Sequence, residues 1–154
     1  MLSPAQTNAL SMFYKAAVES GHIFPSAAAC EAVVESAWNT SELVVKDLNV
    51  FGQKQQVHPI YGTVHIPTKE FLNHEWVTVD ATWIVFPTLA ASFASRMDTL
   101  RRLAPSYPHY AAALAAKTPE EYVTEVSKSW STGPTRATQC IQILHAHPDL
   151  LRAA

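Results

Sequence analysis

Apolar residues recur at helical spacing through the first fifty residues of the chain. Residues 3–6 (Ser-Pro-Ala-Gln) form a capping box with proline at the first helical position, and Gly21 is placed to end the helix that they open. A second, alanine-rich helix is expected over 25–38, and a short third helix over 41–48. Gly52 then interrupts the helical pattern. The chain is therefore predicted to begin with three helices, and the alanines of the second should let a neighbouring helix approach closely.

The pattern changes between Gln55 and Phe86, where β-branched and aromatic residues dominate and prolines and glycines interrupt the chain. Residues 64–71 and 76–86 flank the turn-like sequence Leu-Asn-His-Glu at 72–75, which predicts a β-hairpin. Apolar residues occupy alternate positions of the second strand, at Val77, Val79, Ala81, Trp83 and Val85. This alternation predicts one apolar and one mixed face.

Helical spacing returns after Pro87, with apolar residues at Leu89, Phe93, Met97 and Leu100. Residues 118–121 (Thr-Pro-Glu-Glu) form a second capping box, whose helix we expect to end near Trp130. Residues 133–134 (Gly-Pro) should begin the last helix, and Pro148 should end it. No internal repeat or low-complexity linker is present. Residues 1–154 are therefore predicted to be one mainly helical domain with a small β-lobe at about 56–86.

Composition and charge narrow the class of protein. Of the 154 residues, 48% are hydrophobic and 16% are charged, which suits a single buried core and excludes a disordered chain. The net charge is −2 and the basic residues are scattered, which argues against a nucleic-acid-binding surface. No apolar run is long enough to span a membrane, and residues 1–10 lack the regions of a signal peptide. Export would therefore need another route or a signal outside this chain.

Histidine and cysteine residues give no metal motif. The seven histidines lack the H-E-x-x-H spacing, and Cys30 and Cys140 lie far apart within apolar helical patterns. We therefore expect two buried thiols and no metal or other cofactor. A serine hydrolase is also disfavoured, because Ser36 lacks the G-x-S-x-G elbow.

Glu35 is the first candidate for chemistry. It follows Val33 and Val34 at the C-terminal end of the second predicted helix, with the aromatic Trp38 close by in sequence. The negative end of the helix dipole and the apolar neighbours both favour the protonated carboxyl group, which a general acid needs. The alternative is a solvated residue at the helix end, with Glu31 one turn earlier on the same face.

Residues 33–55 carry two linked motifs that resemble a known family. The bacterial glucosaminidases (glycoside hydrolase family 73), found in flagellar rod-assembly proteins and autolysins, typically read A-x-x-E-S-G-W-G-x-S and, further on, N-L-F-G-x-K. The matching residues are Glu35, Ser36, Trp38, Ser41, Asn49, Phe51, Gly52 and Lys54. Ala37 and Asn39 replace the two glycines. The resemblance implies that Glu35 is the general acid and that Trp38, Asn49 and Phe51 bind substrate.

The resemblance extends over nearly the whole chain, from about Phe13 to Leu144. Residues 67–71 (PTKEF) resemble the family's T-T-E-Y hairpin, residues 84–100 resemble its F-R-x-Y helix, and residues 107–114 resemble its N-P-R-Y segment. The fold that this implies is α+β and lysozyme-like, with a helical main lobe and a β-hairpin lobe over a cleft.

Glu70 matches the acidic residue of the family hairpin, which implies that it is the second catalytic carboxylate. Glycosidases commonly use two carboxyl groups, and their separation decides whether the second attacks the sugar or activates water. Glu75 and Asp80 are rivals, because the register of a hairpin is not fixed by sequence alone. An exposed residue paired with Lys69 is the structural alternative for Glu70. In a third route, the 2-acetamido group of the substrate attacks in place of a protein carboxylate.

The last family motif, G-Y-A-T-D-P, is altered in residues 129–134, which read Ser-Trp-Ser-Thr-Gly-Pro. Trp130 replaces the tyrosine, so an indole N–H stands in place of a phenolic hydroxyl, and Gly133 replaces the aspartate. Trp130 could stack on a sugar ring or could close the final helix pair as a core residue. Tyr61 in the β-lobe is a further candidate for stacking on sugar.

The resemblance implies hydrolysis of the β-1,4 bond that follows N-acetylglucosamine in peptidoglycan, so the protein is expected to act on the cell wall. Two alternatives stay open. A muramidase or lytic transglycosylase would cut the alternate bond with a similar glutamate. A glycan-binding domain that has lost turnover is the other alternative, suggested by Trp130 and Gly133.

Overall fold

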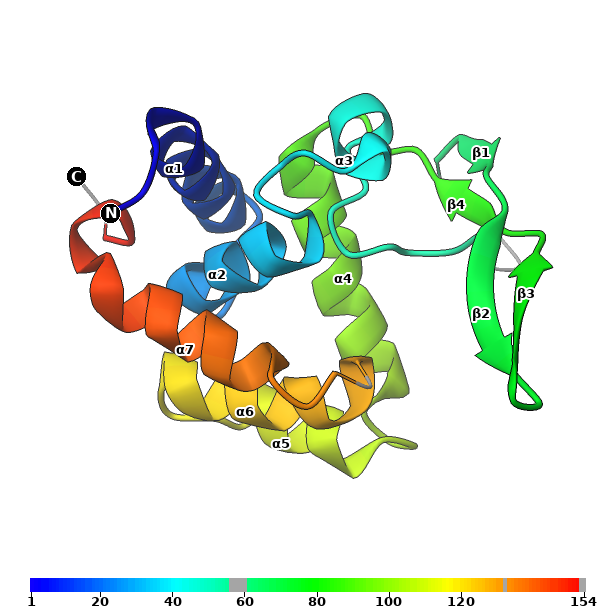
Figure 1. The fold of residues 1–154 in the computed structure, drawn as a ribbon. Coiled ribbons are helices and arrows are strands. Elements are labelled where there is room, and N and C mark those ends of the chain that lie inside the picture. Colours follow the sequence, from blue (N-terminus) through cyan, green and yellow to red (C-terminus); the bar gives the residue numbers. More distant parts are fainter. Residues whose placement is uncertain (56–60, 132, 153–154) are drawn as a thin grey trace.

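The computed structural model describes residues 1–55, 61–131 and 133–152. Within these ranges the chain forms seven α-helices, one 3-10 helix and two antiparallel sheets of two strands each (Figure 1). The helices are α1 (Pro4–Glu19), α2 (Pro25–Glu35), α3 (Glu42–Asp47), α4 (Leu89–Leu103), α5 (Pro108–Leu114), α6 (Pro119–Trp130), α7 (Arg136–Ala146) and the 3-10 helix η1 (Pro148–Leu150). This is the predicted order of helices, a β-region and helices again.

Helix starts follow the capping signals in the sequence. The Ser3 hydroxyl accepts a hydrogen bond from the Gln6 N–H (3.2 Å), and the Gln6 side chain accepts one from the Ser3 N–H (2.9 Å), so the predicted capping box of α1 is confirmed. At α6 the Thr118 hydroxyl accepts from the Glu121 N–H at 3.1 Å. Helix α4 starts after Thr88 rather than at Pro87, because the Thr88 hydroxyl accepts from the Ala91 N–H.

The short helix α5 has no counterpart among the predicted elements. Its seven residues begin with Pro108 at the first helical position and continue through alanines, both of which favour a helix. Seven residues are too few to show helical periodicity clearly, so the pattern was not informative here.

Helix α2 ends at Glu35, three residues before the predicted end. Ala37, Trp38 and Asn39 all have positive φ angles, of 48°, 59° and 66°. The Trp38 N–H donates to the Val33 carbonyl (2.7 Å), which closes the helix end. Glycine adopts such angles without strain, so the family's two glycines fit the positions that Ala37 and Asn39 occupy here.

The β-lobe contains two separate pairs of strands. Strand β1 (Thr63–His65) pairs with β4 (Thr82–Ile84), and β2 (Thr68–Leu72) pairs with β3 (Glu75–Val79). The predicted hairpin is confirmed for β2 and β3, which are joined by a two-residue turn with positive φ angles at Asn73 and His74. The predicted single strand over 64–71 is divided into β1 and β2. Residues 56–60 of the predicted lobe lie outside the described residues.

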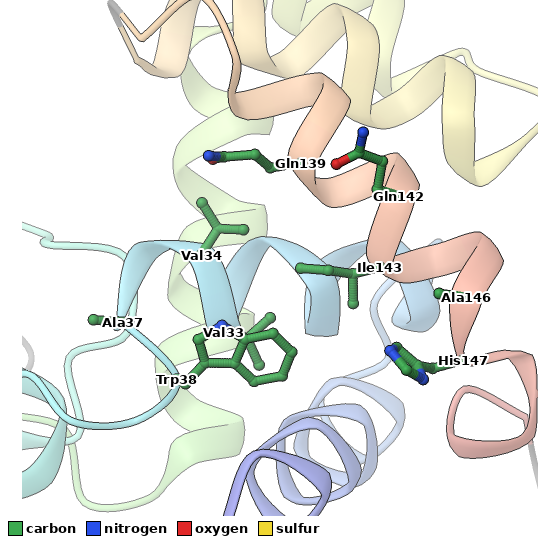
Figure 2. Close-up of a pocket in the computed structure, with 9 residues that line it drawn as sticks. All are labelled: Val33, Val34, Ala37, Trp38, Gln139, Gln142, Ile143, Ala146 and His147. Atoms are coloured by element: carbon green, nitrogen blue, oxygen red, sulfur yellow. The ribbon is translucent and has the colours of Figure 1, made fainter. Parts of the chain in front are cut away.

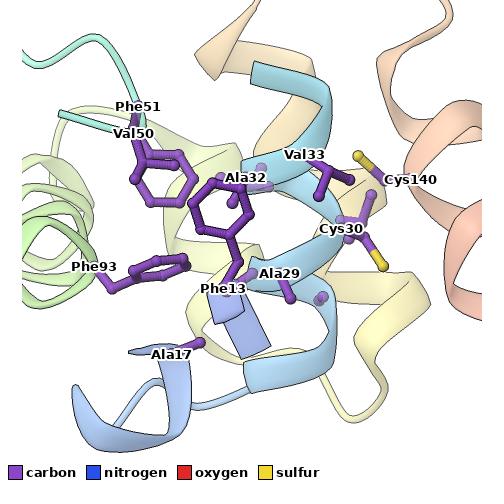
Figure 3. Packing of buried hydrophobic residues seen from close by; sticks show 14 of the residues in the cluster. Phe13, Ala17, Ala29, Cys30, Ala32, Val33, Val50, Phe51, Phe93 and Cys140 are labelled. Atoms are coloured by element: carbon purple, nitrogen blue, oxygen red, sulfur yellow. The ribbon is translucent and has the colours of Figure 1, made fainter. Parts of the chain in front are cut away.

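The core surrounds α2, whose residues 27–33 are all buried. Helices α1, α6 and α7 pack against α2, which confirms the close approach expected from its alanines (Figure 1). Phe13, Phe51 and Phe93 lie on one side of α2, and Cys30 and Cys140 lie on the other (Figure 3). Both cysteines are buried free thiols, as predicted.

No described helix combines the length and the apolar character that a membrane crossing requires.

Candidate active site

Glu35 is the last residue of α2, so the turn that follows the helix leaves its side chain partly open to solvent. The side chain is 25% exposed, and its Oε1 accepts a hydrogen bond from Nε of Arg136 at 2.7 Å. Arg136 is the first residue of α7 and is 101 residues away in sequence. The sequence predicted apolar neighbours for Glu35, whereas in the structure its carboxylate is paired with the cation of Arg136.

Arg136 is fixed by three acceptors on two helices. Besides Glu35, its Nη1 donates to the hydroxyl of Ser127 on α6 at 2.8 Å, and its Nη2 donates to Oε2 of Glu31 on α2 at 2.6 Å. The Arg136 side chain is only 4% exposed. A guanidinium with all three nitrogens bound in this way has one orientation, and it holds Glu35 in a defined place.

Glu31 and Arg96 form the fully buried part of the same ion cluster. Arg96 on α4 donates from Nη1 to Oε1 of Glu31 (2.9 Å) and from Nη2 to Oε2 (2.7 Å). Burial alone would raise the pKa of Glu31, but the charges of Arg96 and Arg136 outweigh it and hold that pKa below its usual value. Burial alone would also lower the pKa of each arginine, and the facing carboxylates hold it above its usual value instead.

Arg96 connects the ion cluster to aromatic rings. Its guanidinium carbon lies 4.6 Å from the ring centre of Phe51 and 4.4 Å from that of Trp130, so the cation contacts both rings. Among the described residues its Nε has no hydrogen-bond partner, which fits a guanidinium held partly by its flat faces. The Tyr122 hydroxyl accepts from Nη1 at 3.3 Å.

A groove of about 340 Å³ lies beside Trp130. It is lined by residues of the loop after α3, of α4 and of α6, namely Gly52, Gln53, Lys54, Gln55, Thr99 and Trp130. Glu35 is not among the lining residues. A chain of hydrogen bonds runs from Glu35 through Arg136 and Glu31 to Arg96. The guanidinium of Arg96 contacts the ring of Trp130, which lines the groove. Trp130 thus combines the two interpretations from the sequence, since its partly buried ring packs on the core and also lines a groove.

Glu70 lies on β2, and its Oε1 accepts a hydrogen bond from Nζ of Lys54 at 2.9 Å. Lys54 lines the groove, so this ion pair places Glu70 at the β-lobe side of it. The expected alternative partner was Lys69, which the structure replaces with Lys54. No contact joins Glu70 to Glu35 within the described residues. The rival Glu75 is exposed at the start of β3, and the rival Asp80 contacts His65 at 3.4 Å.

Asn49 and Phe51 support the site from inside the fold. Asn49 is 1% exposed, and its side-chain amide donates to the carbonyls of Gln53 and Ile84, both at 2.9 Å. Its Oδ1 accepts from the Gln53 N–H, so the amide shapes the groove loop and ties it to β4. Phe51 is 3% exposed and supports Arg96 with its ring. Because both side chains are buried, they are placed to support the groove and not to contact the substrate directly.

Trp38 and Tyr61 lie away from the groove. Trp38 lines a second cavity, of about 470 Å³, between the end of α2 and α7 (Figure 2). Gln139, Ile143 and His147 of α7 and its C-terminal end lie on the other side of this cavity. The Tyr61 ring packs against Phe86, with ring centres 5.3 Å apart. The structure therefore brings Glu35 and Trp130 together through the ion cluster, but not Trp38 or Tyr61.

Arg136, Arg96 and Glu31 are the residues that sequence reasoning did not assign to the site. Glu31 was noted one turn before Glu35, and a carboxylate within an apolar, alanine-rich helix is a signal for a buried partner. Among the described residues, no group of three or more His, Cys, Asp and Glu side chains could hold a metal ion.

The family model for glucosaminidases, described as mannosyl-glycoprotein endo-beta-N-acetylglucosaminidase, matches residues 10–148. A curated relative, a probable N-acetylmuramidase of Lactococcus lactis subsp. cremoris, is 26% identical over 151 residues, which cover 92% of this chain and 33% of the relative. The chain thus spans about a third of the length of the curated relatives it matches.

Solved structures share the fold. The catalytic domain of the autolysin Auto from Listeria monocytogenes has a TM-score of 0.76 and 23% identity, over 98% of this chain and 88% of that one. The C-terminally truncated glycoside hydrolase domain of FlgJ from Salmonella typhimurium has a TM-score of 0.71 and 21% identity, over 94% and 98%. These likenesses confirm the lysozyme-like α+β fold. Because the family model covers nearly all of the chain, the protein belongs to the glucosaminidase family of glycoside hydrolases.

Proposed function

We propose that this domain is a peptidoglycan hydrolase that cleaves the β-1,4 bond following N-acetylglucosamine, with Glu35 as its general acid. The observation that carries the proposal is the setting of Glu35. It ends α2, is one quarter exposed, and has Oε1 held by Arg136, while Oε2 accepts no hydrogen bond from the described residues. One oxygen is thus anchored and the other is available to a substrate.

The proposed reaction needs one proton from the protein. The Oε2–H bond of protonated Glu35 breaks, and the proton passes to the glycosidic oxygen as the bond from that oxygen to the anomeric carbon breaks. The electron pair of the O–H bond stays on the carboxylate, next to the Arg136 guanidinium. The vacated anomeric carbon is attacked from the other side, and water supplies the final hydroxyl. The remaining proton of that water passes to the second carboxylate or back to the carboxylate of Glu35.

Glu70 is the proposed second carboxylate. It stands at the β-lobe side of the groove, and its Oε1 accepts a hydrogen bond from Nζ of Lys54 at 2.9 Å. A carboxylate in this place could act as base or nucleophile. The acetamido group of the substrate is the alternative attacking group, and it would leave Glu70 with a role in binding only.

Trp130 is the proposed sugar platform. Its ring lines the groove, and Arg96 and Phe51 fix its orientation. Apolar faces of sugar rings suit such an aromatic surface. Trp38, Tyr61, Asn49 and Phe51 are not given this role, because two lie away from the groove and two are buried.

A second candidate function is cleavage of the alternate bond, after N-acetylmuramic acid. The curated relatives are named probable N-acetylmuramidases, which favours this candidate and also supports peptidoglycan as the substrate. Both activities would use Glu35 in the same way, so they differ only in which sugar occupies the site before the cleaved bond.

The test is digestion of purified peptidoglycan by the wild-type domain and by Glu35→Gln. Reduction of the products with borohydride followed by mass spectrometry identifies the new ends. Reduced N-acetylglucosamine ends would confirm the proposal, and reduced N-acetylmuramic acid ends would establish the muramidase instead. Anhydro ends would identify a transglycosylase. Absence of any soluble product from the folded wild-type domain would contradict all three activities.

A further inference from the structure

The ion cluster at the end of α2 contains two carboxylates and two guanidiniums, so its charges balance. Glu31 is satisfied by both nitrogens of Arg96, and neither residue is exposed. Arg136 adds the charge that balances Glu35, which it contacts at 2.7 Å. If Arg136 lost its charge, Glu31 would lose its 2.6 Å contact with Arg136 but keep its pairing with Arg96. Glu35 would then have no cation in contact with it among the described residues.

We propose that Arg136 is a positioning residue for Glu35, which fixes Oε1 and stabilises the carboxylate that remains after the proton has been transferred. This inference rests on the proposed function of Glu35. The Arg136 side chain is 4% exposed and that of Glu35 is 25% exposed, so Arg136 acts through Glu35 and not on the substrate.

The geometry separates this role from simple core packing. Nη1 and Nη2 of Arg136 are used by Ser127 and Glu31, which set the plane of the guanidinium, and the remaining Nε is aimed at the candidate acid. A core arginine would need only the first two partners. A donor fixed before the reaction begins costs no reorganisation when the charge on Glu35 develops, and such preorganised donors account for large rate effects in enzymes.

The charge on Glu35 is controlled by few groups. Arg136 on α7 is the cation in contact with it, and Glu31 on α2 and Arg96 on α4 face it from behind Arg136. The thiol of Cys140 on α7 and the hydroxyl of Tyr122 on α6 are further titratable groups of the cluster. Burial raises the pKa of both, that of Cys140 to about 12, so both stay neutral. Removing the charge of Arg136 therefore changes the local field at Glu35 more than any other single substitution in the cluster.

Two substitutions separate the geometry from the charge. Arg136→Lys keeps the charge, and with it the balance of the cluster, but a single Nζ cannot serve three acceptors. Arg136→Met keeps much of the volume and removes the charge. Tyr122→Phe is the matched control, because its hydroxyl belongs to the same buried network but contacts Arg96 and His22 rather than Arg136.

The experiment measures kcat and KM on peptidoglycan for these variants, for the wild type and for Glu35→Gln, at one pH and below the melting temperature of each. We expect kcat to fall about tenfold or more in Arg136→Lys and about a hundredfold in Arg136→Met, with KM within about twofold. Tyr122→Phe should match the wild type in both respects.

The outcomes distinguish this inference from the proposed function. If Glu35→Gln is inactive while both Arg136 variants keep the wild-type kcat, Arg136 is structural and the inference is wrong. If the wild type does not cleave, or Glu35→Gln cleaves at full rate, the proposed function fails instead. Should Arg136→Met not fold, Arg136→Lys still decides, since a loss of melting temperature with unchanged kcat would overturn the positioning role.

Discussion

The guanidinium of Arg96 lies against the indole ring of Trp130, with its central carbon 4.4 Å from the ring centre. Arg96 is completely buried, whereas Trp130 reaches the surface and lines the groove. The contact therefore joins the buried ion cluster, which also holds Glu35 through Arg136, to the wall of the groove. A substitution at Trp130 should consequently affect both stability and substrate binding.

We expect Trp130→Tyr to lower the free energy of unfolding by about 1–3 kcal/mol, because the smaller ring loses part of its contact with Arg96, Phe51 and Tyr110. An aromatic face remains, so turnover should persist with a higher KM. Urea denaturation and kinetics on the same samples measure both effects. Trp76→Tyr is the control, since Trp76 is 71% exposed and should tolerate the change. Equal stability of the two variants would contradict the packing role of Trp130.

Glu35→Gln should lower cleavage of peptidoglycan by a hundredfold or more, since the amide has no proton to transfer. The fold should survive, because the amide oxygen can still accept from Nε of Arg136 and Glu31 still pairs with both arginines. Thermal melts check the fold, and release of soluble muropeptides measures activity. Glu42→Gln on α3 provides a control at an exposed carboxylate paired with Lys46. A Glu35→Gln variant that cleaves at the wild-type rate would remove Glu35 as the acid.

Glu70→Gln should also lower turnover by a hundredfold or more if Glu70 is the base or nucleophile. Its ion pair with Lys54 is solvent-exposed, so stability should change by less than about 1 kcal/mol. Glu75→Gln on the same hairpin is the matched control and should keep full activity. If Glu70→Gln also keeps full activity while Glu35→Gln does not, Glu70 is not the second carboxylate, and Asp80 or the acetamido group of the substrate takes its place.

Features that depend on neighbouring residues could be predicted from the sequence. The capping hydroxyls of Ser3 and Thr118 act within one helical turn, and the two-residue turn between β2 and β3 is equally local. Each of these contacts is set by residues that stand side by side in the chain.

The ion cluster depends on contacts across the fold and could not be predicted. Glu31 meets Arg96 and Arg136 over separations of 65 and 105 residues, and nothing in the local sequence selects these two arginines. Charged residues are seldom fully buried, so the residue type of Glu31 alone predicts a position at the surface. The end of α2 was missed for another reason. Ala37 carries no sequence signal for a left-handed conformation, which glycine or asparagine would have given.

His22 should make stability depend on pH. It is 5% exposed, its Nδ1 accepts from the Phe24 N–H at 2.9 Å, and burial together with the charge of Arg96 lowers its pKa from 6.5 to about 3. Below pH 6.5 His22 therefore binds a proton in the unfolded chain but stays neutral in the folded chain. The free energy of unfolding consequently falls as the pH drops toward 3, by up to about 1.4 kcal/mol per pH unit.

Urea denaturation between pH 6.5 and 5 measures this dependence, above the range in which the lowered pKa of Glu31 begins to contribute. His22→Gln should flatten the curve in this interval, because glutamine does not titrate. His65→Gln, at a side chain that is 57% exposed, is the control substitution at an exposed histidine. Identical slopes for the wild type and His22→Gln would show that His22 does not carry the effect.

Ala37→Gly should raise the free energy of unfolding by about 0.5–1 kcal/mol. Ala37 has a φ of 48°, a left-handed conformation that costs a residue with a Cβ about 1–2 kcal/mol. Glycine removes this cost. Glycine also raises the conformational entropy of the unfolded chain, which offsets part of the gain. Ala111→Gly in α5 is the matched control, because Ala111 is exposed and helical, and there the same substitution should destabilise by about 0.5–1 kcal/mol. Urea denaturation of both variants should thus give changes of opposite sign. A destabilised Ala37→Gly would contradict the strained turn after Glu35.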